Sequence, residues 1–496
     1  MKLPLHSRSL RASLAERVAP PWLDALRRCC DPRFVRDDAA SLWVYSRDRS
    51  PYAVFSARRG RTPAALPAAV VSPGTIEELQ RIVRFTRSEG IALLPFGAGS
   101  GVLGGAMPVA GELVVDLKRL NAVVAFEPDD ALVTVQAGMN GARLETWLNE
   151  RGWTTGHHPQ SMHMSTVGGW VACRGAGQSS TRYGKIEDIV QGCSVVLPDG
   201  RLLTMNPVGR RSTGPAIKDL FVGSEGVLGV FATVTLRIWP KPEVQRPLVL
   251  AFPTLGSGLD AIRTMIQGEL RPAIVRLYDE HETSHRSKGR PPHDRLPILA
   301  FLEFAGDAQL ADTEMQLAAK IAAARGGIAA DLAPYREWQQ HRYLSASVNY
   351  HLKDWFADTI EVTGRWSTLP SMYAEIAAAA RAAHPQLEFG THWSHFYPEG
   401  ACQYMTLRLP PMDDSAAITL LFQLADRIQD ITLAHGGAIS HHHGIGVLRG
   451  YKLAADLGLG VELVQAIKDY LDPQGLFAPG KLGLAGGKHA EDQSST

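Results

Sequence analysis

Three consecutive histidines beside glycines are the sharpest chemical signal in the sequence. His441, His442 and His443 are followed directly by Gly444-Ile445-Gly446. Because neighbouring side chains point in different directions, the three imidazoles cannot all serve packing. A metal tract is disfavoured, since adjacent histidine rings rarely converge on one ion, and a solvated loop is the other plain interpretation. We interpret the run as imidazoles that donate to an anion or move a proton near neutral pH.

A glycine-rich turn follows the apolar run Ile91–Leu94 and predicts a phosphate site. Five glycines fall within residues 97–105. Glycine lets bare backbone approach a ligand, and successive N–H groups in such a turn hold an anion. A P-loop is excluded because no lysine follows the glycines. A dinucleotide turn needs a helix after its glycines, and Pro108 interrupts the segment where that helix would start. The segment therefore predicts a phosphorylated cofactor of another kind.

Two further segments share this character. Residues 156–177 alternate glycine with small and hydroxyl-bearing residues, and residues 219–230 contain three more glycines. A cofactor lying flat against the backbone needs such stretches, because side chains would otherwise block polar contacts. Three glycine-rich segments close together argue against random surface loops.

The composition sets limits on the function. The chain has 496 residues, 45% of them apolar and 20% charged, with a net charge of +1. This length predicts two or three domains, and the balanced charge gives no argument for nucleic acid. The five cysteines show no paired spacing, which is typical of reduced thiols in a cytoplasmic protein. No apolar run reaches the ~18 residues of a membrane span, and no cleaved signal is expected.

The order of elements predicts an α+β protein in four parts. Residues 1–66 are expected to form an N-terminal helical extension, and residues 67–242 a cofactor-binding domain that begins with strand Ala69–Val71 and a helix capped by Thr75. Pro240-Lys241-Pro242 marks a boundary. Residues 243–440 predict an antiparallel sheet with helices on one face, which forms a substrate or cap domain. Residues 441–496 carry the histidines, one helix and a polar, disordered tail.

The three glycine-rich segments resemble the FAD-contacting segments of the vanillyl-alcohol-oxidase type of flavoprotein. The matching motifs are Phe96-Gly97-Ala98-Gly99-Ser100, Ser165-Thr166-Val167-Gly168-Gly169-Trp170-Val171 and Gly223-Ser224-Glu225-Gly226-Val227-Leu228-Gly229. Within that family the chain is most similar to the alkyl-dihydroxyacetone-phosphate synthases of ether-lipid synthesis, from about residue 67 to 482. The resemblance implies a two-subdomain FAD-binding domain of the PCMH type, followed by an α+β cap of the FAD-linked oxidase C-terminal type.

The resemblance also implies the cofactor contacts. Pro95 to Gly101 would wrap the pyrophosphate, the segments at 160–166 and 173–176 would line the flavin and its ribityl chain, and 225–231 would reach the adenine side. The implied residues are Pro95, Phe96, Gly97, Ala98, Gly99, Ser100, Gly101, Gln160, Ser161, Ser165, Thr166, Gly168, Gly169, Cys173, Arg174, Gly175, Ala176, Glu225, Gly226, Gly229 and Val230. Gln160 stands where relatives have aspartate. No histidine or cysteine lies in residues 95–105, so we expect non-covalent FAD, with His157 and His158 as the remaining candidates for a tether.

The catalytic and substrate residues follow from the same resemblance. His441, His442 and His443 match the triple histidine over the flavin, and Tyr404 in Gly400-Ala401-Cys402-Gln403-Tyr404 matches the tyrosine that transfers a proton at the substrate carbon. The implied substrate residues are Arg276, Lys353, His392 and His395. Lys353 stands where the synthases have an arginine, and lysine loses the bidentate fork for a phosphate. The 391–398 segment has histidine where the animal synthases have arginine. We expect no metal site.

We expect an enzyme that exchanges the acyl group of acyl-dihydroxyacetone phosphate for a fatty alcohol, with no net redox change. The alternative is an FAD dehydrogenase or oxidase of a D-2-hydroxy acid. Such relatives carry glutamate where His442 stands and a Gly-Asp-Gly-Asn segment that 391–404 lacks. A third alternative is a flavin-binding or lipid-carrier protein without catalysis. The expected partner is a small-molecule or lipid substrate, and a homodimer and peripheral membrane contact stay open.

Overall fold

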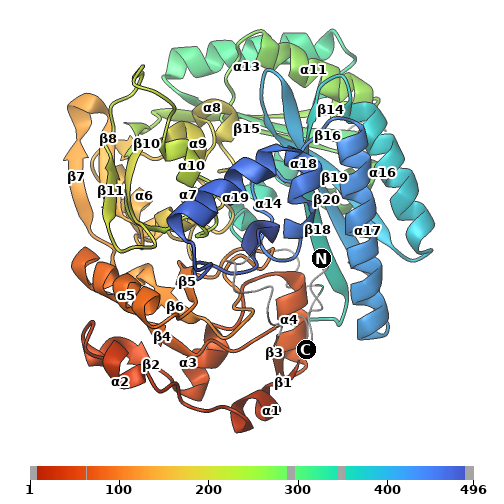
Figure 1. Ribbon diagram of the computed structural model, residues 1–496. Coiled ribbons are helices and arrows are strands. Elements are labelled where there is room, and N and C mark those ends of the chain that lie inside the picture. Colours follow the sequence, from red (N-terminus) through yellow and green to blue (C-terminus); the bar gives the residue numbers. More distant parts are fainter. Residues whose placement is uncertain (1–7, 63, 288–295, 345–349, 351, 486–496) are drawn as a thin grey trace.

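The computed structural model describes residues 8–62, 64–287, 296–344, 350 and 352–485 (Figure 1). Three main sheets make up the fold, and the chain visits them in order from the N-terminus. None of the helices in these ranges is long and apolar enough to cross a membrane. Each of the five cysteines is a free thiol.

The first sheet is small and mostly parallel. Its order is β2-β4-β6-β5, in which only β2 runs antiparallel. The strands are β2 (Val35–Arg36), β4 (Ala69–Val71), β5 (Leu93–Phe96) and β6 (Leu113–Asp116). Helix α5 (Ile76–Ser88) packs on the sheet through Leu79 and Ile82, and the Thr75 hydroxyl accepts the N–H of Glu78 at 3.2 Å. The predicted strand and helix cap are thus confirmed.

The second sheet is antiparallel and has the order β11-β10-β12-β8-β7. The strands are β7 (Val123–Glu127), β8 (Leu132–Gln136), β10 (Val190–Val196), β11 (Leu202–Met205) and β12 (Val230–Arg237). The β10–β11 hairpin turns at Pro198-Asp199-Gly200, where Gly200 has φ +81°. Helices α6 (Gly141–Asn149) and α7 (Val167–Ala172) pack into the same core.

The third sheet is antiparallel throughout and has the order β17-β14-β16-β15-β19-β20-β18. Its strands are β14 (Val244–Phe252), β15 (Ile274–Tyr278), β16 (Ile298–Gly306), β17 (Ile328–Ala329), β18 (Phe356–Arg365), β19 (Glu388–Phe396) and β20 (Gly400–Leu409). Strand β19 is absent from the sequence prediction.

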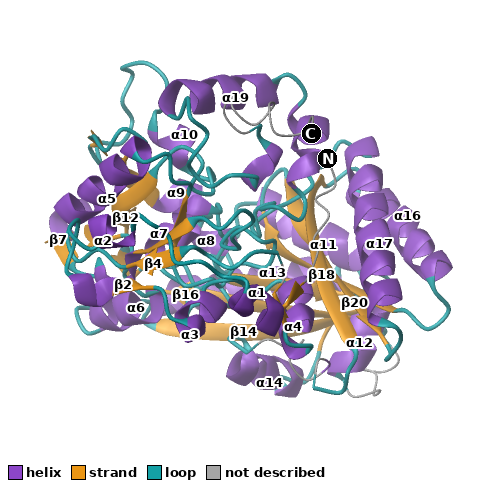
Figure 2. Ribbon diagram, turned by 60° about the horizontal axis from the view of Figure 1, so that its bottom comes forward, coloured by secondary structure: helices purple, strands orange, loops and turns teal. Residues whose placement is uncertain are grey.

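Long helices cover one face of this sheet, as predicted. They are α11 (Leu255–Gln267), α13 (Ala308–Ala323), α16 (Leu369–Ala383) and α17 (Asp414–Ala434). The expectation that helices keep to one face is only partly right, because α14 (Ala333–His341) packs Tyr335 and Trp338 against the other face, on Leu299 and Phe301. Figure 2 shows α14 on the opposite side of β14 from α11 and α13.

Shorter elements connect these parts. The N-terminal ones are β1 (Arg8–Ser9), α1 (Leu10–Ala15), α2 (Leu23–Leu26), α3 (Ala39–Val44), α4 (Pro51–Arg58) and β3 (Arg61–Thr62). The others are β9 (Trp153–Thr154), α8 (Ser180–Tyr183), α9 (Ile186–Ile189), α10 (Lys218–Phe221), β13 (Trp239–Pro240), α12 (Glu280–Arg286), α18 (Leu453–Leu457) and α19 (Gly460–Leu471).

Residues after the third sheet pack against the domain that the first half of the chain forms. Helix α19, drawn in blue across the middle of Figure 1, packs with Val464 and Ile467 against the core around the second sheet. The loop that carries the histidines joins the same core through Ile439 and Ile445. Residues 439–445 therefore lie where the third sheet meets the glycine-rich segments. The end of the predicted disordered tail, residues 486–496, lies outside the described residues.

Candidate active site

One row of polar side chains crosses the third sheet on the face opposite the four long helices. Tyr278 on β15 pairs with His392 on β19, His392 pairs with Tyr404 on β20, and Tyr404 pairs with Glu361 on β18. Each member of the row has at least one neighbour in the helix-covered core, namely Leu277, Trp393, Met405, and Ile360 with Val362. Because strand side chains alternate between faces, the apolar neighbours force this row onto the open face.

Glu361 anchors the histidine loop to this row. Its carboxylate accepts the backbone N–H of His441, the backbone N–H of His443 at 2.9 Å and the hydroxyl of Ser440 at 2.7 Å. Glu361 is fully buried. Burial alone would raise the pKa of its carboxyl, but the hydrogen bonds from the His443 backbone and the Ser440 hydroxyl favour the charged form, and the pKa lies below its usual range. An ionised carboxylate thus fixes the path of the loop.

The three imidazoles face one another and the row. The Nδ1 atoms of His441 and His442 are 3.0 Å apart, and the ring of Tyr404 lies 6.0 Å from that of His442 and 5.6 Å from that of His443, between centroids. Burial lowers the pKa of His442 below its ordinary value, and that of His443 to about 3. The rings are therefore neutral at neutral pH, and each carries one unprotonated nitrogen.

Tyr404 is held between His392 and the loop. Its ring stacks on His392 with centroids 4.7 Å apart. Burial raises the pKa of Tyr404 to about 12, so its phenol keeps its proton at neutral pH. His392 in turn lies 2.7 Å, Nε2 to Nη2, from the guanidinium of Arg276, which stands beside Tyr278 on the same face of β15. Burial, followed by the charge of Arg276, lowers the pKa of His392 well below its usual value.

A second chain of contacts reaches the site from the first half of the protein. His395 Nδ1 lies 2.7 Å from the hydroxyl of Ser180, on α8, and Tyr397 donates to that hydroxyl at 3.2 Å. The Tyr397 hydroxyl is also 3.1 Å from Nε2 of His441. Lys185 donates to the carbonyl of His441 at 2.5 Å. These contacts join the histidine loop to the segment that follows the second glycine-rich stretch.

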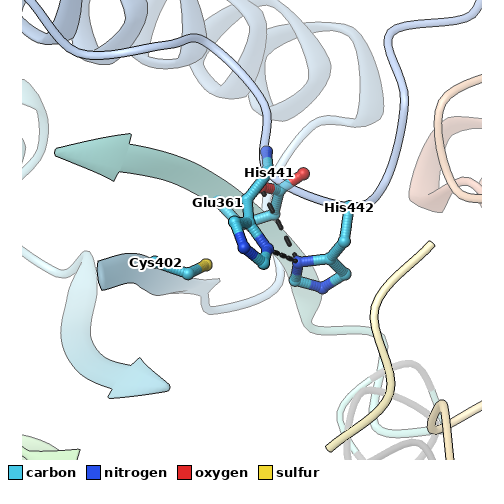
Figure 3. A group of neighbouring side chains, drawn as sticks. All are labelled: Glu361, Cys402, His441 and His442. Atoms are coloured by element: carbon cyan, nitrogen blue, oxygen red, sulfur yellow. Dashed lines mark hydrogen bonds and ion pairs between the residues drawn. The ribbon is translucent and has the colours of Figure 1, made fainter. Parts of the chain in front are cut away.

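The donors of Glu361, Cys402, His441 and His442 lie within 4.8 Å of one another (Figure 3), a spacing that could hold a metal ion. However, both carboxylate oxygens of Glu361 already accept backbone N–H groups. The hydrogen bonds account for this group without an ion.

The first glycine-rich segment has the form of an anion cradle. Within the described part of the chain, the N–H groups of residues 98–101 donate to no protein acceptor. Gly99 has φ +61°, and a Cβ on Gly97 would lie 2.4 Å from Oγ1 of Thr166 in the second segment. The two segments therefore approach each other closely, and free N–H groups stand where the resemblance implies a pyrophosphate. The residues fit FAD.

Glu225 contacts the histidine loop, and its implied contact with FAD stays a prediction. Its carboxylate accepts the N–H of Ile445 at 2.8 Å and that of Gly446 at 2.9 Å. Burial raises the pKa of this carboxyl to about 7. The third glycine-rich segment thus holds the far end of the histidine loop, as Glu361 holds its beginning.

Other residues implied for FAD have protein partners of their own. Gln160 donates through Nε2 to the carbonyl of Leu344 at 2.8 Å, and Arg174 pairs with Glu187 at 3.3 Å. His157, a candidate tether, is fully buried with its ring 4.6 Å from that of Trp170, and neither of its ring nitrogens has a partner in the described structure. The contacts of these residues with FAD stay predictions.

Among the predicted catalytic and substrate residues, the structure brings together all but Lys353. That lysine is exposed on the turn before β18, where its N–H donates to the carbonyl of Tyr350 at 2.9 Å. The sequence prediction missed Glu361, Tyr397, Ser180 and Lys185. For Glu361 a local signal existed, because a carboxylate stands directly between the apolar residues Ile360 and Val362.

Two family models match most of the chain. An FAD binding domain matches residues 67–206, and the C-terminal domain of FAD linked oxidases matches residues 241–482. The first spans the glycine-rich segments at 97–105 and 156–177, and the second spans the third sheet and the histidine loop.

Individual relatives point in two directions. The chain is 28% identical to an alkyldihydroxyacetonephosphate synthase of Caenorhabditis elegans, over 86% of this chain and 78% of the relative. It is 27% identical to a D-2-hydroxyglutarate dehydrogenase of Xanthomonas citri pv. viticola, over 94% of this chain and 97% of the relative. A solved alkyldihydroxyacetonephosphate synthase superposes with a TM-score of 0.78 at 22% identity, covering 93% of this chain and 86% of that one.

The fold, the cradle and these matches agree. The predicted PCMH-type FAD-binding fold with an FAD-linked oxidase C-terminal domain is confirmed, and so is FAD as the cofactor. The chain belongs to the FAD-linked oxidase family of flavoenzymes.

Proposed function

We propose that this flavoenzyme exchanges the acyl group of acyl-dihydroxyacetone phosphate for a fatty alcohol, giving an ether lipid precursor. The observation that carries the proposal is the contact of the Tyr404 ring with three neutral imidazoles, those of His392, His442 and His443. Such an exchange needs proton transfers at a substrate carbon and at two oxygens but no external electron acceptor. The match to synthases over most of the chain supports the same reaction.

The chain's own residues would handle protons and orientation, while FAD, when bound, supplies the electron-rich ring that activates the substrate carbon. The Tyr404 phenol, with its pKa near 12, holds a proton for exchange at that carbon. A neutral imidazole of the 441–443 loop accepts the hydroxyl proton of the entering alcohol. The Glu361 carboxylate keeps the loop in place, and the fatty acid leaves as its carboxylate.

The second candidate is oxidation of a D-2-hydroxy acid, because a D-2-hydroxyglutarate dehydrogenase is among the relatives. Neutral buried histidines could serve as the base in that reaction as well. Histidine at position 442, where the resemblance places glutamate in such dehydrogenases, supports the synthase instead.

The deciding experiment uses purified holoenzyme and two substrates. Palmitoyl-dihydroxyacetone phosphate is mixed with hexadecanol without an electron acceptor, and fatty acid and ether product are measured by mass spectrometry. In parallel, D-2-hydroxyglutarate is offered with a redox dye. We expect equal amounts of fatty acid and ether product, and no dye reduction. Dye reduction without ether product would replace the synthase by the dehydrogenase, and the Tyr404→Phe variant controls for background hydrolysis.

A further inference from the structure

A second guanidinium joins Arg276 beside the catalytic row. Arg286 is the last residue of α12, and its guanidinium carbon lies 4.5 Å from the ring centroid of Tyr278. The guanidinium carbon of Arg276 lies 5.7 Å from the same centroid. Tyr278 itself is fully buried, and its register partner is His392, which stacks on Tyr404. Two cations thus flank one ring next to the proposed acid.

Neither cation has an acidic partner in the described structure. Arg276 donates to the hydroxyl of Tyr278 at 2.8 Å and meets the neutral His392 at 2.7 Å. The Nε of Arg286 is buried and has no hydrogen-bond partner among the described residues. A buried donor without a partner calls for an explanation, and a ligand that accepts from it would supply one.

The nearby carboxylates are committed elsewhere. Glu282, on the same helix as Arg286, pairs with Arg408 at 2.7 Å, and both side chains are almost fully buried. Asp279 accepts the N–H of Thr391 at 2.7 Å and the hydroxyl of Tyr373 at 3.0 Å. Glu282 also feels the charge of Arg286, but this single carboxylate is shared between Arg408 and Arg286. The three guanidinium groups therefore leave a net positive charge, which favours an anion at this place.

We propose that Arg276 and Arg286 together hold the anionic group of the substrate, a phosphate or a carboxylate, so that its reacting carbon lies at Tyr404. This inference rests on the proposed function. Guanidinium groups suit such anions because their planar fork donates two parallel hydrogen bonds. Lys353, the residue expected in this role, is exposed and cannot offer a fork. Arg286 supplies it from a different element.

The test measures binding rather than turnover, by calorimetry on the holoenzyme. The probes are dihydroxyacetone phosphate, dihydroxyacetone and D-2-hydroxyglutarate. We expect dihydroxyacetone phosphate to bind, dihydroxyacetone to bind far more weakly, and Arg286→Met to weaken the phosphate ester at least about tenfold. Arg286→Lys should fall between the two, because it keeps the charge without the fork. Arg427→Met, on the exposed side of α17, is the matched control.

The outcomes separate this inference from the proposed function. Unchanged phosphate-ester binding in both Arg286 variants, or no binding of either anion to the wild-type enzyme, overturns the anion site. Arg286-dependent binding of dihydroxyacetone phosphate without ether synthesis supports the anion site and refutes the synthase. Arg286-dependent binding of D-2-hydroxyglutarate alone also supports the anion site and identifies its anion as a carboxylate.

Discussion

Glu361 and Tyr404 stand directly opposite each other across the β18–β20 strand pair, on the open face of the third sheet. The first holds the histidine loop through its backbone, and the second places its phenol beside the imidazoles. The register of this one strand pair therefore determines both the position of the histidine loop and the position of the Tyr404 phenol. The two roles can be separated by mutation, because Glu361 holds the histidine loop in position and Tyr404 takes part in proton transfer.

Glu361→Gln should disrupt the loop rather than the reaction alone. The side-chain amide of glutamine has only one oxygen, so it cannot accept the backbone N–H groups of both His441 and His443. One of these buried N–H groups would then face the amide NH₂, at a cost of about 1–3 kcal/mol. We expect a lower midpoint of thermal unfolding, and loss of turnover with every substrate. Glu375→Gln, on the exposed side of α16, should leave both unchanged. Wild-type stability and turnover in Glu361→Gln would contradict the anchoring role.

Tyr404→Phe should act on the reaction alone. The substitution keeps the ring that stacks on His392 and removes only the hydroxyl. We expect kcat to fall about 10²-fold or more, the usual contribution of a positioned acid or base, with little change in thermal unfolding. Tyr470→Phe, which alters an exposed tyrosine of α19, is the control. A kcat within a factor of two or so of the wild type would remove Tyr404 from the mechanism.

The sequence allows the cofactor segments to be recognised but not the row across the sheet. Glycine-rich turns are local features, so residues 97–101 can be interpreted without knowing what they contact. Glu361, in contrast, meets the backbone of a residue 80 positions away. Such a contact depends on strand register, which no local pattern specifies.

The prediction missed strand β19 for a related reason. Its sequence places His392, Ser394 and His395 among apolar residues, and this mixture hides the alternation that marks a half-buried strand. The polar residues are there because the open face of the sheet carries the site. The residues that obscure the strand are thus the ones that matter for function.

FAD should dissociate as an intact molecule when the protein is denatured, because no covalent bond holds it. The N–H groups of residues 98–101 suit a pyrophosphate, and the candidate tether His157 is packed on Trp170. We expect acid precipitation to release all the flavin to the supernatant, and intact-protein mass spectrometry to give the mass of the unmodified chain. Flavin that stays with the precipitate would show a covalent bond, and peptide mapping would then identify the residue that carries it.

The pH dependence of stability should report the buried histidines, and His157 gives the simplest case. Burial lowers its pKa from 6.5 to about 3, because the charged imidazolium is disfavoured inside the protein. Below about pH 6.5, His157 is therefore protonated in the unfolded chain, while in the folded protein it stays neutral down to about pH 3. This histidine's contribution is fully present above about pH 6.5 and is lost as the pH falls towards 3.

His157→Phe should remove that loss while keeping a ring against Trp170. The free energy of unfolding of the variant is compared with that of the wild type at about pH 8 and again at about pH 5. Between the two pH values, this difference should shift in favour of the variant by about 2 kcal/mol. Urea unfolding of the holoenzymes at the two pH values measures the shift. His341→Phe alters an exposed histidine of α14 and should show no such change. An equal difference at both pH values would mean that His157 titrates normally, and hence that water or a polar partner reaches its ring in solution.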